Sequence, residues 1–496
     1  MSKPDISVVI EPSKGTSVVY EPVAPNDSQS KPSGIVCLQL TITNNGSKQI
    51  HLNKVKLSFS SPPSVPDKII PVPTTWWPPG GTGVNIAPAG QPGSTYVWNF
   101  LRESGENDAA VLPSPAPASM TLSLFFDGFT SPWKVTKTLA PHRNPVAGSA
   151  YLFPAQTSDL RAGEFWGASS DTHATGAAGS QLFGYDMNVI AWDENANSLN
   201  RLLPGKSGDK NEDYRIWGKK IYAMADGIVL QRLNKCPNND PPLANQFNGN
   251  VAHDAQLWTD QANSFWGAYD NSHGGESVVH AGAGNHFYIQ HGNEVVLYAH
   301  MQKGSLNKDI LSGGVGATVN AGDFLGLAGN SGNASEPHLH IHAVRGTAPE
   351  TGPLRPLLFR DILTIDPASL SFPSTYGPWA TMTRQGPPIV PWTSAARPSA
   401  LIWPAAERIS QPERPNIYEL AIDPLALILR HDIYVRLTLP DPPPVEVIEA
   451  QIRQLVKTMS PNERKLALTQ VKAFRTVYAR ILERELSTAE RRQKRR

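Results

Sequence analysis

The sequence predicts a mainly β fold for the first 365 residues, and three observations support this. Apolar and polar residues alternate in short runs, as at Val36, Leu38 and Leu40, which is typical of strands with one buried face. The chain holds 45 prolines and 39 glycines among 496 residues, and only 18% of the residues are charged, which suits a protein of strands and turns. An apolar stripe with helical spacing appears only after residue 444.

Residues 1–142 are predicted to form an immunoglobulin-like β-sandwich. The alternation returns at Val55 and Leu57 and again around Leu122, with turn residues between the runs. Several short strands at such intervals are typical of a sandwich of two antiparallel sheets. We therefore expect an N-terminal β-sandwich domain, whose function the sequence leaves open.

A histidine-rich strand is the most informative stretch of the second part. Pro337-His338-Leu339-His340-Ile341-His342 is apolar and β-prone, and side chains on a strand alternate between faces, so His338 and His340 share one face. Imidazole is the commonest protein ligand for zinc. Because a lone pair of histidines at this spacing is more often a surface feature, the metal interpretation needs support from elsewhere in the chain.

Three further motifs precede the histidine strand and give that support. They are Tyr222–Val229 with its Asp-Gly turn, Asn285–Met301 with Tyr298-Ala299-His300 near its end, and Val319–Gly326, which leads into a glycine-rich strand reversal. In this order the motifs resemble the lysostaphin/LytM-type zinc metallopeptidases, which cut peptide bonds in bacterial cell-wall peptidoglycan. The resemblance covers residues 165–365, under half of the chain, and implies a metallopeptidase domain over residues 147–365.

The resemblance implies one Zn²⁺ per chain and gives each site residue a role. Asp186 and His340 would be metal ligands. His338 would be the general base and His300 the partner on the oxyanion side, unless the two histidines share these roles. His342 lies ~6.6 Å further along the strand than His340 and is expected behind the ligands or at the surface.

The first metal ligand departs from the family pattern. The usual form is H-x-x-x-D, and here Leu182 stands where the histidine would be. Some relatives take the ligand from an upstream loop instead, and Ser169–His173 offers one that ends 13 residues before Asp186. His173 is therefore the candidate first ligand, and the alternative is an ordinary solvated loop histidine.

Residues 231–284 form an insertion between two strands of a hairpin, and the insertion contains His253, His273 and His280. A loop of this length is usually functional or disordered. We expect a lid that narrows the substrate groove, and one of its histidines could replace the missing ligand. A decorated surface loop is the plainer alternative.

The last third of the chain changes character. Residues 366–444 are rich in proline and are predicted to form an extended arm draped over the core. Residues 445–496 are predicted to be a helical tail, because the stripe from Leu468 to Leu482 follows helical spacing behind a capping box that begins at Ser460. Such a stripe can face a second helix or a protein partner.

Composition limits the partners. The chain has 44 basic and 43 acidic residues and a formal charge of +1, so nothing indicates nucleic-acid binding. No apolar segment follows Met1 and no run approaches the ~20 residues of a membrane span, so we expect neither a Sec signal nor a transmembrane segment. Cytoplasmic residence in the producing cell is then expected, unless a specialised route exports the protein. A secretion carrier or another protein could bind the β-sandwich or the helical tail.

Two classes of function compete. The first is an active zinc endopeptidase that acts on peptidoglycan peptides and could be an exported effector. The second is a metal-free peptidoglycan-binding or regulatory module on the same fold. Loss of the ordinary first histidine favours the second, and joint retention of Asp186, His300, His338 and His340 favours the first. A carrier or phosphotransfer domain on a similar sheet is a weaker third hypothesis.

Overall fold

The computed structural model covers the whole chain but describes only part of it. The described residues are 3–23, 33–72, 75–76, 79–80, 83–99, 110–113, 115–161, 164–169, 182–193, 198–270, 281–360, 362–365, 380–381, 400–404 and residues 453, 456, 457 and 484. The predicted first ligand His173 lies outside them, as do His273, His280 and the predicted stripe from Leu468 to Leu482. Within the described residues strands predominate, and the prediction of a mainly β fold is confirmed.

The N-terminal part consists of two β-sheets that pack face to face. Leu40 and Trp98 from the smaller sheet and Leu122 from the larger one belong to the same buried apolar cluster. The smaller sheet has the order β1 (Ile6–Glu11), β5 (Gln39–Asn44), β11 (Thr95–Asn99). The larger sheet has the order β10 (Val84–Ile86), β6 (Ile50–Phe59), β13 (Ser119–Phe126), β14 (Trp133–Pro141), β3 (Ser17–Val23), β4 (Ser33–Val36), β12 (Ala110–Leu112), with β2 (Ser13–Lys14) on β3 and β7 (Lys68–Pro71) on β6.

The alternation seen in the sequence produces this sandwich. In β5 every second residue is buried, so Leu40 and Ile42 face the core while Gln39 and Thr41 do not. Burial of large apolar side chains contributes about 1.5–3 kcal/mol each and fixes the register, because a one-residue slip would turn the apolar face outward. A small separate ladder joins β8 (Thr75–Trp76) to β9 (Pro79–Gly80).

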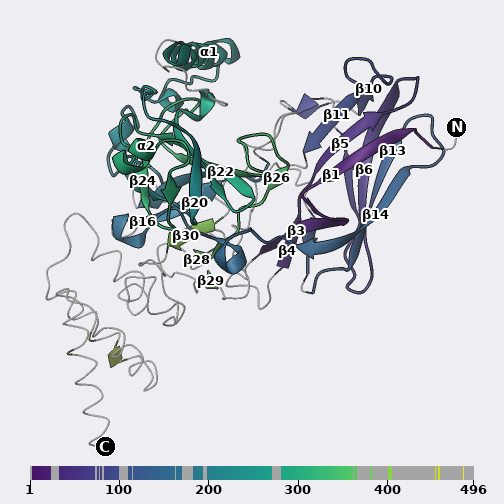
Figure 1. The fold of residues 1–496 in the computed structure, drawn as a ribbon, viewed down its shortest axis with the longest axis horizontal. Coiled ribbons are helices and arrows are strands. Elements are labelled where there is room, and N and C mark those ends of the chain that lie inside the picture. The colour runs from purple at the N-terminus through teal and green to yellow at the C-terminus, as the bar shows by residue number, and fades with distance from the viewer. Residues whose placement is uncertain are drawn as a thin grey trace, which may run out of the picture.

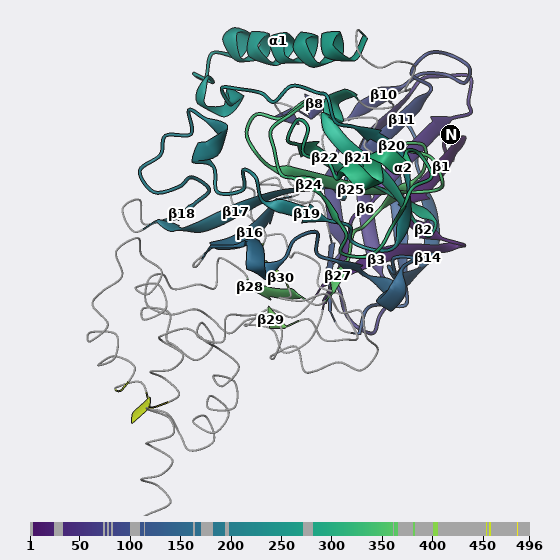
Figure 2. The same ribbon diagram turned by 60° about the vertical axis from the view of Figure 1, so that its left-hand side comes forward.

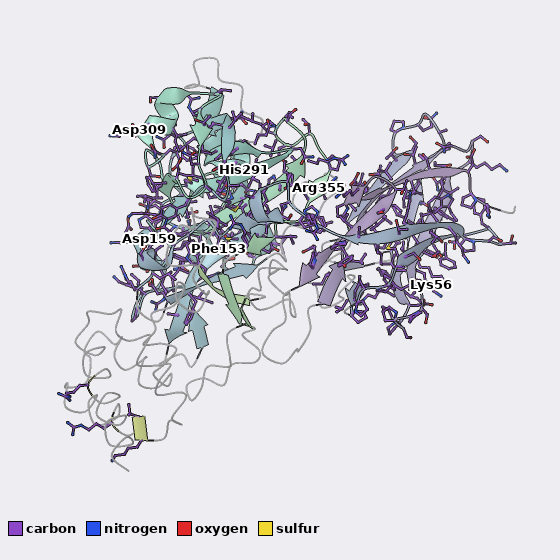
Figure 3. The ribbon with its side chains drawn as sticks, turned by 60° about the horizontal axis from the view of Figure 1, so that its bottom comes forward. Lys56, Phe153, Asp159, His291, Asp309 and Arg355 are labelled. Carbon is purple, nitrogen blue, oxygen red and sulfur yellow. The ribbon has the colours of Figure 1, made fainter. Side chains whose placement is uncertain are left out.

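The second part is built on one large, mainly antiparallel sheet that lies beside the sandwich (Figure 1). Its order is β23 (Thr318–Val319), β20 (Gly227–Leu233), β21 (Asn285–His291), β22 (Glu294–Met301), β25 (Leu339–Arg345), β17 (Tyr185–Asp193), β16 (Glu164–Ser169), β30 (Ala400–Pro404), β28 (Ile362–Ile365), β29 (Ala380–Thr381), with β18 (Ser198–Asn200) on β17 and β26 (Leu354–Arg355) on β25. Two short pairs, β15 (Tyr151–Leu152) with β27 (Phe359–Arg360) and β19 (Lys220–Tyr222) with β24 (Phe324–Leu327), complete the ladders. Phe153 lies in the core of this part, and Arg355 lies between the two parts (Figure 3).

Short helices connect these strands. They are η1 (Ala147–Ser149), η2 (Thr157–Asp159), η3 (Asn211–Asp213), η4 (Leu243–Asn245), η5 (Ala281–Ala283) and α2 (Lys308–Gly313). Among the described residues no helix is both long and apolar enough to cross a membrane.

Two segments differ from the simplest interpretation of the sequence. The insertion between β20 and β21 contains a helix, α1 (Val251–Asp270), which lies along one side of the second part (Figure 2). Asn250 caps its first turn by accepting hydrogen bonds from the backbone of Ala252 and His253, both at 3.1 Å. The predicted arm, residues 366–444, is not wholly draped over the core, because β29 and β30 extend the large sheet.

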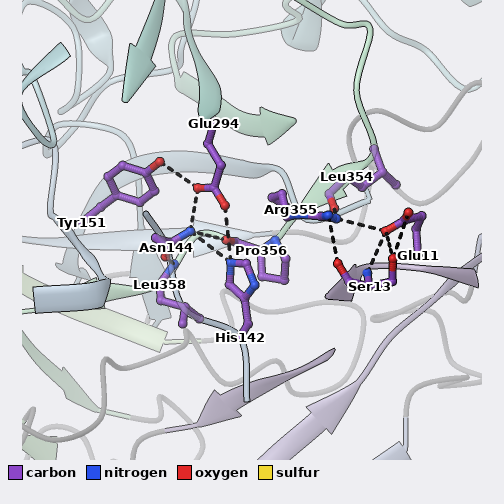
Figure 4. A network of polar contacts seen from close by, with 10 residues as sticks. All are labelled: Glu11, Ser13, His142, Asn144, Tyr151, Glu294, Leu354, Arg355, Pro356 and Leu358. Carbon is purple, nitrogen blue, oxygen red and sulfur yellow. Dashed lines mark hydrogen bonds and ion pairs between the residues drawn. The ribbon is translucent and has the colours of Figure 1, made fainter. Parts of the chain in front are cut away.

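A buried polar network joins the two parts (Figure 4). Arg355 donates from Nη1 to Oε2 of Glu11 at 3.1 Å and from Nη2 to the carbonyl of Ser13 at 3.1 Å. Nearby, the carboxylate of Glu294 accepts hydrogen bonds from Asn144 Nδ2 at 2.9 Å and from the Tyr151 hydroxyl at 2.8 Å. Arg355 therefore bonds the second part directly to the first strands of the sandwich, and Asn144 bonds the segment between the two parts to β22.

Candidate metal and catalytic site

Three adjacent strands place the predicted site residues together. In the ladder Asp186 of β17 is paired with His340 of β25, and His340 is paired with Ala299 of β22. Residues that face each other across an antiparallel ladder project to the same side of the sheet. Asp186 and His340 therefore share one face, and His338, two residues before His340, joins them.

His300 reaches the same site by a local distortion. Because Ala299 lies opposite His340, a regular strand would turn His300 to the other face. Its φ angle is +64°, a left-handed conformation that costs a residue with a side chain about 1–3 kcal/mol. The distortion brings the His300 ring to 4.6 Å from the His338 ring and 5.8 Å from the His340 ring, measured between centroids. Strain of this kind is concentrated at functional sites.

Asp186 is the centre of the polar contacts. Its Oδ1 lies 3.0 Å from His340 Nδ1 and 3.3 Å from His338 Nε2. Two ligands of a tetrahedral zinc ion, each bound at about 2.0–2.1 Å, lie about 3.3 Å apart. Carboxylate oxygen and imidazole nitrogen are also donors that zinc accepts, so the Asp186–His340 pair fits two of the three protein ligands of such an ion.

The remaining histidines are each oriented by a backbone carbonyl. His338 Nδ1 donates to the carbonyl of Glu336 at 2.9 Å, and His300 Nδ1 donates to the carbonyl of Ser331 at 2.8 Å. A neutral imidazole carries one proton, so in both rings the proton lies on Nδ1 and the lone pair on Nε2. Each ring can therefore accept a proton at Nε2.

Burial and charge separate the two rings. His300 is buried, and this burial, together with the nearby rings of His338 and His340, holds its pKa well below the usual range. For His338 burial acts in the same direction, but the carboxylate of Asp186 outweighs it and raises the pKa to about 9. The same group of side chains thus includes one imidazole that is neutral and one that gains a proton beside a carboxylate.

The loop before the histidine strand is held by the insertion. Asn239 donates from Nδ2 to the carbonyls of Gly332 at 2.9 Å and Ala334 at 3.1 Å, and Gln261 of α1 donates to the carbonyl of Ala334 at 2.7 Å. The carbonyl of Ser331, in the same loop, accepts from His300. The insertion is thus packed against the loop that orients a site histidine.

The structure brings together four of the five predicted residues, Asp186, His300, His338 and His340. The fifth, His173, lies outside the described residues. Within the described part of the chain, no group of three or more His, Cys, Asp or Glu side chains has the geometry of a metal site. Leu182, at the family's ligand position, is fully buried in an apolar cluster and is a core residue.

Three other histidines of this sheet are buried. His342 is 1% exposed and its Nδ1 lies 2.8 Å from His340 Nε2, so it lies behind the ligands and the expectation of a surface position is wrong. His291 bonds the carbonyl of Asp226 and the hydroxyl of Tyr298. His286 is buried, and its Nδ1 donates to the carbonyl of Gly284 at 2.7 Å.

Sequence comparison identifies this part of the chain. Residues 274–351, which include His300, His338 and His340, match Peptidase family M23. This match supports the M23-type peptidase domain that the order of the motifs resembles. Because the family is one of peptidases, the match supports a hydrolase domain. No curated protein matches the chain.

Two solved structures resemble the M23 domain weakly. A zinc-containing peptidase from Vibrio cholerae is 16% identical, with 52% of this chain and 53% of that chain covered and a TM-score of 0.20. The catalytic domain of the antimicrobial peptidase lysostaphin from Staphylococcus simulans is 14% identical, with 40% of this chain and 93% of that chain covered and a TM-score of 0.20. The chain thus spans about half the length of the first structure, and the family assignment depends on the sequence match alone.

Proposed function

We propose that the chain is a zinc-dependent endopeptidase that hydrolyses peptide bonds of bacterial cell-wall peptidoglycan. One observation supports this above all. Asp186, His338 and His340 converge within 3.3 Å on one face of the sheet, and His300 joins them only through a strained backbone. A purely structural sheet would not require four such side chains in one place.

Asp186 and His340 would hold the zinc ion, with His173 as the proposed third ligand. When bound, zinc polarises the scissile carbonyl and lowers the pKa of a bound water toward ~7. One ion per chain is expected, as the resemblance to the family implies.

His338 and His300 would move the protons of the reaction. In the neutral state each presents the Nε2 lone pair, because each Nδ1–H is held by a backbone carbonyl. We assign His338 the role of general base, since the Asp186 carboxylate stabilises the imidazolium that forms when His338 accepts a proton. His300 would lie on the oxyanion side of the site. Because its neutral ring presents a lone pair at Nε2, it could stabilise the oxyanion only after gaining a proton there, and the alternative is that it shares the role of proton acceptor with His338.

A second candidate function is a metal-free module that binds peptidoglycan or regulates another enzyme. The buried Leu182 favours it, because this residue removes the ligand that the family pattern places there. The two candidates differ in one measurable property, which is zinc bound per chain.

The place of action is also a proposal. Peptidoglycan lies outside the cytoplasmic membrane, so an enzyme of this kind needs a route to it. We propose an exported effector whose β-sandwich or helical tail, residues 445–496, binds a secretion carrier while the site stays free.

The test uses purified full-length protein. Its zinc content is measured by elemental analysis, and isolated sacculi are digested with and without a chelator. We expect one zinc per chain and release of peptide fragments that stops when the metal is removed. Metal-free protein that binds sacculi without cutting them would support the second candidate, and protein that neither binds zinc nor sacculi would overturn both.

A further inference from the structure

His340 is held from behind by a chain of buried hydrogen bonds. Its Nδ1 faces Asp186 Oδ1 at 3.0 Å, and its Nε2 lies 2.8 Å from Nδ1 of His342. Nε2 of His342 in turn lies 2.7 Å from Oε1 of Glu350. The same Oε1 accepts a hydrogen bond from the hydroxyl of Tyr288 at 2.7 Å.

This chain is enclosed by the protein. His340 is 3% exposed, His342 1% and Tyr288 1%, so water does not compete for most of these bonds. Glu350 has a φ angle of +58°, which for a residue with a side chain costs about 1–3 kcal/mol. The turn after β25 holds this strained residue in place, with its carboxylate against His342.

The carboxylate decides where the protons lie. Glu350 can only accept when it is ionised, so Nε2 of His342 carries the proton and Nδ1 of His342 carries the lone pair. That lone pair accepts from His340, so the proton of His340 lies on Nε2. Both rings are then neutral, and the His340–His342 and His342–Glu350 contacts each have one donor and one acceptor. The lone pair of His340 lies on Nδ1, the nitrogen that faces Asp186, so this contact joins two acceptors, which a bound cation would bridge.

We propose that His342 and Glu350 are positioning residues that fix His340 in its metal-binding tautomer and ring orientation. The proposal rests on the proposed zinc function, because it concerns the nitrogen that a metal ion would need. Groups behind metal-binding histidines typically change metal affinity by about 10–100-fold. Here the group is a histidine–carboxylate pair, which sequence spacing alone does not reveal.

Zinc affinity tests the proposal. The dissociation constant of zinc is measured by chelator competition for the full-length protein and for the variants His342→Phe and Glu350→Leu. Each variant breaks the series of hydrogen bonds behind His340 and leaves His340 itself unchanged. We expect both variants to bind zinc about 10–100-fold more weakly than the unaltered protein. The matched control is His291→Phe, which also removes a buried, hydrogen-bonded imidazole from this sheet, one that bonds Asp226 and Tyr298.

The outcomes separate the two proposals. If the unaltered protein binds no zinc, the proposed function fails, and this inference fails with it. If the unaltered protein binds zinc and both variants bind it as tightly as His291→Phe does, the positioning role alone is overturned.

A second measurement needs no variant and so does not depend on whether a variant folds. In zinc-loaded protein labelled with ¹⁵N-histidine, the nitrogen shifts should show protons on Nε2 of both His340 and His342. A proton on Nδ1 of His342 would reverse the direction of the chain and contradict the proposal.

Discussion

Strand β22 carries one histidine–carboxylate cluster at each of its ends, and the two clusters differ in a useful way. At its start, Glu294 is enclosed by His142, Asn144 and Tyr151, which we call the junction cluster. At its end, His300 lies with His338, His340 and Asp186, the candidate site. Both are buried and both combine imidazole with carboxylate.

The junction cluster is closed. Asn144 donates to Glu294 and to the carbonyl of Pro356 at 2.9 Å, and its Oδ1 accepts from the backbone of Leu358 at 3.0 Å. Burial lowers the pKa of His142 to about 3, so its ring stays neutral. Each of these groups finds its partner within the protein, as expected of a cluster that stabilises the fold.

The candidate site is open by comparison. His338 and His300 each use Nδ1 for a backbone carbonyl, Nε2 of His338 faces the Asp186 carboxylate, and Nε2 of His300 keeps a lone pair for another molecule. The backbone of His300 is strained in the position that places it there. Residue type alone therefore does not separate a structural cluster from a reactive one, whereas an available lone pair and backbone strain do.

The largest effect should come from the open cluster. His338→Ala should lower kcat by about 10²–10⁴-fold while zinc stays bound, because the variant loses the proposed general base and keeps both ligands. His340→Ala and Asp186→Ala should lose the metal. Elemental analysis of zinc and turnover measured on sacculi check this prediction. Loss of zinc in His338→Ala would contradict it and would indicate that His338, not His340, is the metal ligand.

Part of the fold and of the candidate site can be predicted from the sequence. Alternation with a period of two places Leu40 and Leu122 in the sandwich core, and it places His338 and His340 on one face. These are local properties of a strand. The order of the motifs also indicates the family, because it depends only on residue types and their spacing along the chain.

Other features depend on contacts between distant residues and have no local signal. The turn of His300 onto the site requires its left-handed φ, which no residue in Tyr298-Ala299-His300 indicates. Glu350 meets His342 because the chain reverses after β25, and Asn239 meets the site loop across about 90 residues of sequence. The sequence indicates a loop or lid for the insertion, whereas the structure has helix α1 there, with Val251 and Trp258 exposed.

A second, smaller effect should appear in the closed cluster as a dependence of stability on pH. Burial raises the pKa of Glu294 from 4.5 to about 7, so between these values the folded protein holds a proton that the unfolded chain releases. Stability from this group is therefore present below pH 4.5 and is lost as pH rises through 7. Glu294→Gln cannot ionise and should escape this loss, which is at most about 3 kcal/mol.

The measurement is the melting temperature of both proteins between pH 5 and pH 8. His142, whose pKa is lowered, acts in the opposite direction below pH 6.5, but it is present in both proteins and largely cancels in the difference. As pH rises, the melting temperature of Glu294→Gln should increase relative to that of the unaltered protein. Glu212→Gln, which removes an exposed carboxylate, controls for net charge, and a difference that stays constant with pH would contradict the buried-acid explanation.

The smallest effect concerns the insertion, residues 231–284, and decides between a lid and a support for the site loop. Asn239→Ala removes the two side-chain hydrogen bonds to Gly332 and Ala334, each with a net value of about 1 kcal/mol. If the insertion supports the loop whose Ser331 carbonyl orients His300, kcat should fall by about 5-fold with KM nearly unchanged. Asn245→Ala, which breaks a bond of the same insertion to Ser207 and leaves the loop alone, is the control. A rise in KM at constant kcat would instead favour the lid that the sequence predicts. If Asn239→Ala and Asn245→Ala have the same kcat and KM, the contacts of Asn239 play no part in catalysis.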